Sequence, residues 1–407
     1  MRIIGRTSVL LAMTAFVISA MAPAEVAHAA TDSKFIAGVQ IRPNSVTNND
    51  LAQIAQMGFN GIRLGIRKEL VTKDGRALDW SLYDRIFKLA RQHNLTVVAT
   101  LFDGDAAKHE GNRSPAWVNE FSSFAADTVK RYGYTNQVIW EIWNEPNGAT
   151  YWSKTPDPVA YANMVRNTCQ NMRVANPQAT IFAGALGTDA AEFPYDPFIQ
   201  QLTPIVKAGC INAISIHPYR QDKPETVSLT LADLRHRYPG VPFEITEWGY
   251  TAAGRAYSSS QAYAWTSRIL LASQFAGSRI AIIYEWRSSK PLPSNREQNF
   301  GIIRTDGQPT MSFEPLARTL KWLRGSSERC LLNSKVYCLT SSTIDRQPVS
   351  LVWSDTCQSV TIAREGYDPR QSMDANTKQL IPASKKILID RFPREFEGLP
   401  QSPLNCP

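Results

Sequence analysis

Residues 138–147 read VIWEIWNEPN, an apolar run that ends in polar residues and a proline. Short apolar runs bounded by turn-forming residues are typical of buried strands. Similar runs recur along residues 35–284, and longer amphipathic segments separate them. The expected strands are 35–41, 61–66, 95–101, 138–143, 180–184, 213–217, 242–246 and 280–284.

The segments between these runs carry apolar residues three and four positions apart, the spacing of an amphipathic helix. The clearest of them are 49–57, 81–93, 117–132, 158–175 and 259–275. Strands that alternate with helices over about 290 residues predict an α/β fold of the (β/α)8 barrel type. An open, doubly wound sheet would alternate in the same way, but the sequence has no GxGxxG or GxxxxGK phosphate loop.

The first 29 residues have the layout of a secretory signal peptide. Arg2 and Arg6 precede an apolar run, and small residues follow it up to Ala29. We therefore expect cleavage near Ala29 and Ala30, and a secreted or periplasmic protein. No later stretch approaches the roughly 18 to 20 apolar residues that a transmembrane helix needs, so no integral membrane segment is expected.

The remainder is expected to form two domains, a catalytic barrel over residues 30–325 and a small β-rich module over 326–407. After residue 325 the runs 336–339, 349–353 and 360–362 are short, β-prone and separated by polar residues. We expect this module to support the barrel structurally; sugar binding is the alternative.

The six cysteines indicate disulfides rather than a metal site. They are Cys169, Cys210, Cys330, Cys338, Cys357 and Cys406. Four of them fall in the last 78 residues, where disulfides are expected to staple the module in one of three connectivities. The sequence has no CxxC pair and no Cys/His cluster with zinc spacing, so no metal site is expected.

The net charge of +8 has two interpretations. It could draw the protein to an anionic polysaccharide or a membrane surface. The basic residues are spread along the chain without a long run, which favours ordinary solubility. No nucleic-acid partner is expected, and the protein is expected to be a monomer.

Two glutamates fall where a barrel places its chemistry, at the C-terminal ends of strands. Glu145 follows the fourth expected strand, and Glu247 follows the seventh. They lie 102 residues apart, about the length of three βα units of roughly 31 to 35 residues each. Both should face one pocket. Hydrolysis of a glycosidic bond needs such a pair, one carboxyl to protonate the departing oxygen and one to attack or support the anomeric carbon.

Residues 138–147 together with 243–250 (FEITEWGY) resemble glycoside hydrolase clan A, most closely its cellulase-like families 5 and 39. The resemblance extends to LDWSLYD at 78–84 and FGI at 300–302, and covers residues 35–325. It implies that Glu145 is the acid/base and Glu247 the nucleophile of a retaining enzyme. Such an enzyme works by double displacement through a covalent glycosyl-enzyme and needs no cofactor.

The resemblance also implies supporting roles for five residues. Asn144 would hold the sugar 2-hydroxyl, Arg63 would keep Glu247 ionised, and His217 would support the acid/base. Tyr219 would donate to the nucleophile, and Trp286 would form the aromatic floor beneath the sugar. Each has an ordinary alternative: a capping Asn, a structural ion pair, or packing in the core.

Other polar residues receive structural interpretations. Glu141 shares the strand parity of Glu145 but lies deeper in the barrel, so we expect it to be buried and paired. Glu244 and Glu285 are also expected to be structural. Substrate contacts are expected near Asp103 and His109, although residues 102–105 (FDGD) match no clan pattern and leave the substrate open.

The expected substrate is a β-linked polysaccharide or oligosaccharide. Trp117, Tyr151 and Trp152 could form stacking platforms for an endo-acting cleft, but most tryptophans in a barrel belong to the core. Two other functions stay open: a non-catalytic polysaccharide-binding barrel, and a transglycosylase that uses the same site.

Overall fold

The computed structural model describes residues 35–73, 77–104, 114–133, 137–153, 155–188, 193–253, 258–291 and 295–323, and seven strands after residue 327. The expected signal peptide and its cleavage site lie outside the described residues. So do His109, Cys357 and Cys406.

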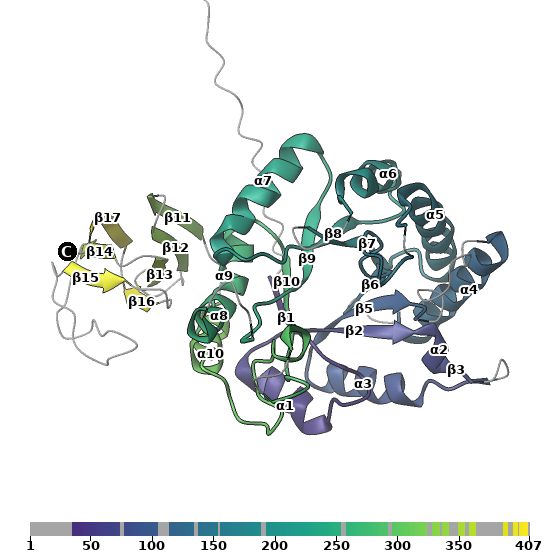
Figure 1. Ribbon diagram of the computed structural model, residues 1–407, viewed down its shortest axis with the longest axis horizontal. Coiled ribbons are helices and arrows are strands. Elements are labelled where there is room, and N and C mark those ends of the chain that lie inside the picture. Colours follow the sequence, from purple (N-terminus) through teal and green to yellow (C-terminus); the bar gives the residue numbers. More distant parts are fainter. Residues whose placement is uncertain are drawn as a thin grey trace, which may run out of the picture. The chain divides into compact units, whose positions relative to one another are not determined.

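Eight parallel strands form a closed barrel, which confirms the predicted (β/α)8 fold (Figure 1). The strands are β1 (Ile36–Gln40), β2 (Gly61–Arg67), β5 (Thr96–Phe102), β6 (Val138–Ile142), β7 (Thr180–Gly187), β8 (Ala213–His217), β9 (Phe243–Trp248) and β10 (Ile280–Ile283). Each contains or overlaps an expected apolar run. The ring closes where β1 pairs with β10, with Ile36 opposite Ile280.

Helices surround the strands (Figure 1). They are α1 (Asn48–Met57), α3 (Ser81–Gln92), α4 (Pro115–Tyr132), α5 (Pro158–Ala175), α6 (Asp196–Lys207), α7 (Val227–Arg237), α8 (Ser259–Thr266), α9 (Ile269–Phe275) and α10 (Phe313–Trp322). A short helix α2 (Lys68–Val71) follows β2 and leads into the two-residue strands β3 (Thr72–Lys73) and β4 (Ala77–Leu78). Among the described residues, the 3-10 turns η2 (Pro224–Thr226) and η3 (Arg296–Gln298) lie in loops.

Side-chain caps define several helix starts. Thr47 and Asp50 form a capping box at α1, in which each side chain accepts a backbone N–H of the other residue. Asp157 caps α5, and a proline follows it at the first helical position. These polar residues fix where each loop ends and its helix begins.

The prediction of one continuous helix over 259–275 is wrong. The chain breaks between α8 and α9, where Arg268 is buried and pairs with the equally buried Glu225 at 2.9 Å. A buried guanidinium needs a counter-charge, and Glu225 lies in η2. The helical pattern of apolar residues does not reveal this tertiary pairing.

Inside the barrel, an apolar layer lies below a polar one. Val98, Ile139 and Phe182 pack there with Ala213, Ile280 and Ile282. Two residues further along β5 and β6, the same face carries Thr100 and Glu141, both buried and hydrogen-bonded to each other at 2.7 Å. The barrel is thus filled below and polar directly beneath its C-terminal end.

Strand β9 carries a bulge near its end. Ala281 of β10 lies opposite Ile245, but Ile283 lies opposite Trp248, so β9 holds one extra residue. A bulge interrupts the regular alternation of side chains and re-aims them. Thr246 is fully buried, while the next residue, Glu247, lines the active-site cavity.

A disulfide joins Cys169 in α5 to Cys210, which follows α6. It connects two neighbouring outer helical segments across 41 residues. Among the described residues, no helix is both long and apolar enough to cross a membrane.

The described C-terminal strands form two antiparallel sheets. One contains β11 (Glu328–Asn333), β12 (Val336–Ser341), β13 (Val349–Ser354) and β16 (Arg394–Glu397); the other contains β14 (Gln358–Ala363), β15 (Lys386–Ile389) and β17 (Leu399–Asn405). Three of these strands fall on the expected β-prone runs. Cys330 and Cys338 are opposite each other in the β11–β12 register. Disulfide stapling of this segment stays a prediction.

Candidate active site

A cavity of about 390 Å³ opens at the C-terminal ends of the barrel strands. It contains both expected catalytic carboxylates, together with aromatic, amide and guanidinium side chains. Its lining residues are Gln40, Arg63, Gly65, Arg67, Thr100, Phe102, Asn144, Glu145, Tyr151, Tyr219, Glu247, Tyr284, Arg296, Glu297 and Phe300.

The two carboxylates approach each other closely. One oxygen of Glu145, one oxygen of Glu247 and one ring nitrogen of His217 all lie within 4.8 Å of one another. Glu145 follows β6 and Glu247 ends β9, so strands on different sides of the barrel bring them together. The predicted shared pocket is therefore present.

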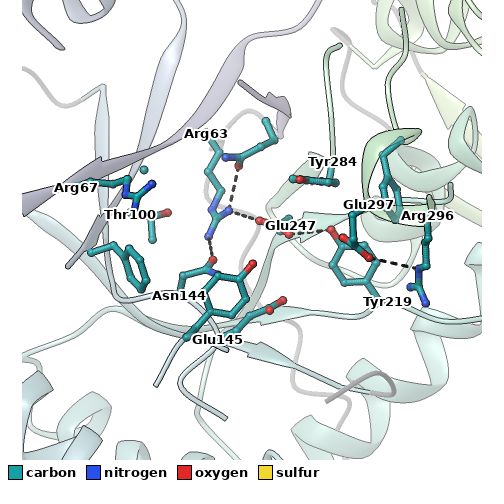
Figure 2. Close-up of a pocket in the computed structure, with 15 residues that line it drawn as sticks. Arg63, Arg67, Thr100, Asn144, Glu145, Tyr219, Glu247, Tyr284, Arg296 and Glu297 are labelled. Atoms are coloured by element: carbon teal, nitrogen blue, oxygen red, sulfur yellow. Dashed lines mark hydrogen bonds and ion pairs between the residues drawn. The ribbon is translucent and has the colours of Figure 1, made fainter. Parts of the chain in front are cut away.

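Arg63 of β2 holds one side of this pair (Figure 2). Its Nη1 donates to Glu247 Oε2 at 2.5 Å, and its Nη2 donates to Asn144 Oδ1 at 2.9 Å. It also makes a 2.6 Å ion pair with Glu141, which is fully buried as expected. Because Asn144 accepts through Oδ1, its amide N–H groups are directed elsewhere and can donate to a ligand hydroxyl.

The turn after β6 aims Glu145 at the cavity. Trp143 and Glu145 both adopt positive φ values, 73° and 42°, a backbone conformation that non-glycine residues adopt rarely. Asn147 stabilises the turn by donating to Gly187 O at 2.7 Å and accepting from Gly187 N at 3.1 Å. Backbone strain of this kind is concentrated at functional sites.

His217 lies beside Glu145, as the resemblance implied. Its Nδ1 is 2.9 Å from Glu145 Oε1, and the imidazole is fully buried at the end of β8. The buried ring can therefore fix the orientation of the Glu145 carboxyl group.

Tyr219 reaches Glu247 from the loop after β8. Its hydroxyl donates to Glu247 Oε1 at 2.8 Å. Burial, followed by the negative charge of Glu247, raises the pKa of Tyr219 well above 10. Tyr219 therefore stays a donor at any working pH. Arg63 donates to the other oxygen of Glu247, so each oxygen of this carboxylate accepts from one donor.

The expected position of Trp286 beneath the sugar is wrong. Trp286 is 2% exposed, belongs to the hydrophobic core, and donates its indole N–H to Asp50 at 2.9 Å. Tyr284, two residues earlier, lines the cavity instead. Burial, followed by the nearby charges of Glu285 and Glu247, raises the pKa of Tyr284. The peptide bond between Tyr284 and Glu285 is cis.

The expected aromatic platforms are divided between cavity and core. Tyr151 lines the cavity. Trp152 is buried against Trp143 and Tyr161, and Trp117 stacks on Phe121. Asp103 is buried and accepts from Trp117 Nε1 at 3.2 Å, so it serves the surrounding structure.

The sequence pattern did not identify several lining residues. Gln40 ends β1 and accepts from Arg63 at 3.0 Å, and Phe300 contacts the ring of Tyr284. Arg67 lies on one side of the carboxylates, while Arg296 and Glu297 lie on the other (Figure 2). Gln40 could have been found by reading the first strand end as closely as the others. The residues from loops carry no comparable signal.

Glu145, His217 and Glu247 are close enough together to be considered as metal ligands. Arg63 already provides a permanent positive charge 2.5 Å from Glu247. A bound cation would be repelled by that guanidinium and would displace the Glu145–His217 contact. The arrangement favours acid/base and nucleophilic chemistry by the carboxylates themselves.

Residues 29–270 match the family model for cellulase (glycosyl hydrolase family 5). Cellodextrinase A of Ruminococcus flavefaciens is 26% identical over 161 residues, which are 37% of this chain and 46% of that protein. An endoglucanase of Clostridium saccharobutylicum is 22% identical over 267 residues, 64% of this chain and 54% of that protein. The chain spans about half the length of these curated relatives.

Solved structures share the fold. A family 39 glycoside hydrolase of Bacteroides cellulosilyticus superposes with a TM-score of 0.72 and 18% identity, covering 90% of this chain and 81% of that one. A family 39 enzyme of Xanthomonas axonopodis pv. citri gives a TM-score of 0.62 and 16% identity, covering 91% and 95%. At these identities the likeness shows a shared fold and nothing beyond it.

Proposed function

Since this chain belongs to the cellulase family, glycosyl hydrolase family 5, we propose that it is a retaining β-glycosidase acting on a β-linked polysaccharide or oligosaccharide. Glu145 is the acid/base and Glu247 the nucleophile. Asn144, Arg63, His217 and Tyr219 support them.

The spacing of the carboxylates is the observation that carries the proposal. Oxygens of Glu145 and Glu247 lie within 4.8 Å of each other. Retaining glycosidases hold their carboxyl groups about 5 to 5.5 Å apart, whereas inverting enzymes separate them by about 6.5 to 9.5 Å to admit a water. The spacing therefore favours direct attack by Glu247.

In the first half-reaction, Glu247 attacks the anomeric carbon while Glu145 gives its proton to the glycosidic oxygen. The glycosidic C–O bond breaks, an ester bond forms to Glu247, and Glu145 is left ionised. Arg63 and Tyr219 each donate to one oxygen of Glu247, which fixes the carboxylate for attack. The free amide of Asn144 donates to the sugar 2-hydroxyl, a contact that strengthens in the transition state.

In the second half-reaction, Glu145 takes a proton from a water as that water attacks the anomeric carbon. The ester bond breaks, Glu247 regains its charge, and the sugar leaves with its anomeric configuration retained. His217, 2.9 Å from Glu145, keeps the carboxyl group directed at the same position in both steps.

The substrate class is argued from the cavity and the relatives. Aromatic rings at Phe102, Tyr151, Tyr284 and Phe300 offer faces on which apolar sugar faces stack. The matched relatives are a cellodextrinase and an endoglucanase. We therefore propose β-glucan chains first and endo cleavage as the mode, by a secreted or periplasmic monomer.

The test is hydrolysis of β-glucans, xylans, mannans and bacterial exopolysaccharides by wild type, Glu145→Ala and Glu247→Ala. Both variants should fall by several orders of magnitude. Added azide should restore turnover as a β-glycosyl azide with Glu145→Ala and as an α-glycosyl azide with Glu247→Ala. Glu244→Gln is the matched control, since Glu244 is a buried barrel glutamate paired with Arg279 instead of with site residues.

The same experiment separates the other functions. A wild type that retains a polymer without cleaving it would identify a binding protein and contradict the proposal. Products longer than the substrate, formed at high acceptor concentration, would identify a transglycosylase. An inverted anomeric product would exclude the double-displacement mechanism.

A further inference from the structure

Glu141 lies in the polar layer beneath the cavity, fully buried on β6. It has no direct access to substrate, yet it contacts the residue that holds the nucleophile. Resting on the proposed function, we propose that Glu141 is a positioning residue that acts through Arg63. It is the permanent counter-ion that remains when Glu247 loses its charge in the glycosyl-enzyme.

Arg63 cannot swing to another partner. A guanidinium has five N–H donors. Nε donates to Glu141 at 2.9 Å, Nη1 to Gln40 at 3.0 Å and Glu247 at 2.5 Å, and Nη2 to Glu141 at 2.6 Å and Asn144 at 2.9 Å. All five are engaged. With Arg63 only 2% exposed, bulk water cannot solvate its charge either.

The charges explain why the third carboxylate matters. In the free enzyme one Arg63 cation faces two anions, Glu141 and Glu247. When the Glu247 oxygen bonds to the anomeric carbon, the electron pair of the broken glycosidic bond goes to the departing oxygen. That oxygen takes the proton of Glu145. Glu247 is then neutral, and without Glu141 the cation would be buried with no counter-charge, which is strongly unfavourable.

Glu141 is suited to remain an anion throughout turnover. Burial alone would raise the pKa of Glu141, but the charges of Arg63 and His217 and the hydrogen bond from Thr100 lower it overall. During ester formation Glu247, which is bound to Arg63, loses its negative charge. Glu145, which lies beside His217, gains one. Glu141 pairs directly with Arg63, and the charge of His217 also lowers the pKa of Glu141.

The test is Glu141→Gln, which removes the charge and keeps the shape. With Glu141 neutral, Arg63 stabilises ionised Glu247 alone, so forming the ester becomes harder and hydrolysing it becomes easier. We expect kcat/KM for 2,4-dinitrophenyl β-glycosides, which reports ester formation, to fall about 10- to 100-fold. We expect the hydrolysis rate constant, measured in single turnover, to be unchanged or higher. Rapid quench and intact-protein mass spectrometry should find less covalent intermediate.

Three further variants make the test specific. Glu141→Asp keeps the charge. The ratio of the rate constant for ester formation to that for ester hydrolysis should therefore return towards the wild-type value. Arg63→Gln leaves two carboxylates facing each other without the cation between them. Compared at a pH high enough to keep Glu247 ionised, it should therefore shift the ratio in the opposite direction. The prediction for Arg63→Gln still tests the inference if Glu141→Gln fails to fold. Glu244→Gln, buried but paired with Arg279, should change neither constant.

The inference is overturned if Glu141→Gln slows both half-reactions by the same factor, as a packing defect would. It is also overturned if Glu141→Asp shows the imbalance of Glu141→Gln, or if Arg63→Gln shifts the ratio in the same direction. A wild type that cleaves none of the glucosides, xylosides, mannosides and cellobiosides tried would overturn the proposed function, and this inference with it. An active wild type beside a balanced Glu141→Gln overturns the inference alone.

Discussion

At the scale of single residues, two aromatic side chains that follow β10 have different roles. One lines the cavity, and the other packs in the core. Tyr284 faces the cavity, whereas Trp286 is turned into the core and bound to Asp50. Asp50 also caps α1 and accepts from Arg287 at 2.5 Å. One buried carboxylate therefore joins a helix start to the loop that follows β10.

This division predicts different defects for the two aromatic residues. Trp286→Phe removes the indole donor from buried Asp50 and should lower the free energy of unfolding by about 1 to 2 kcal/mol, with KM unchanged. Tyr284→Ala removes a cavity wall and should raise KM. Urea unfolding and steady-state kinetics on both variants check this. A raised KM in Trp286→Phe would restore the floor role to Trp286.

A second prediction concerns the pH dependence of stability. Burial raises the pKa of Glu285 above its ordinary value of 4.5, and hydrogen bonding to Arg42 offsets this only in part. The folded protein then binds more protons than the unfolded chain above pH 4.5. The free energy of unfolding therefore falls as pH rises from about 4.5 through the folded pKa.

Glu285→Gln should consequently be more stable than wild type at pH 7 and lose that advantage at pH 4. Chemical unfolding at the two pH values measures the difference. A variant that is less stable than wild type at pH 7 would mean that the Arg42 ion pair outweighs the burial of the charge.

At the scale of elements, the sequence predicts strands well because each is a continuous apolar run, buried on both faces. Helix starts also follow from local residues such as Thr47 and Asp50. Features made by tertiary contacts could not be predicted. The break at Arg268 depends on Glu225, 43 residues away, and the bulge in β9 depends on how β9 pairs with β10.

The same contrast applies to the site. Strand-end motifs brought Glu145, Glu247, Asn144, His217 and Tyr219 together correctly, because parallel strand ends share one face of the barrel. Trp286 was misplaced because the resemblance matched the aromatic residue by its position in the sequence after the eighth strand, whereas the chain beyond β10 turns this side chain into the core. Arg63 was expected beside Glu247, but its bonds to Gln40 and Asn144 depend on three-dimensional packing.

The disulfide between Cys169 and Cys210 gives a prediction at this scale. Closing a loop of 41 residues restricts the unfolded chain and should contribute about 3 to 4 kcal/mol. The double variant Cys169→Ala/Cys210→Ala should lose about that much stability in denaturant unfolding and keep its kcat/KM, since neither residue lines the cavity. Equal stability of variant and parent would show that the bond is not formed in the purified protein.

At the scale of the whole molecule, the barrel supplies the residues that line the cavity, and the C-terminal strands supply none of them. Every residue that lines the cavity lies between Gln40 and Phe300. The barrel also closes on itself through β1 and β10, so its hydrogen bonding is complete without the strands after residue 327.

Deletion of the residues after Arg329 should therefore preserve turnover of small glycosides but lower stability and solubility, if the module is structural as proposed. Thermal unfolding, yield of soluble protein and activity on a small glycoside measure this. If only binding to polymer is lost, the module is a sugar-binding one.

The pairing of β1 with β10 also has a consequence for synthesis. Ile36 and Ile280 are partners although 244 residues separate them. At about 5 to 20 residues per second, a ribosome needs about 12 to 50 seconds to deliver the second after the first. Throughout that interval the edge of β1 that pairs with β10 has no native partner, although its other edge can already pair with β2, so the ring can close only late in translation or after release. Until the ring closes, that open strand edge can pair with another chain, so the interval of synthesis is the period in which the nascent chain is most exposed to aggregation.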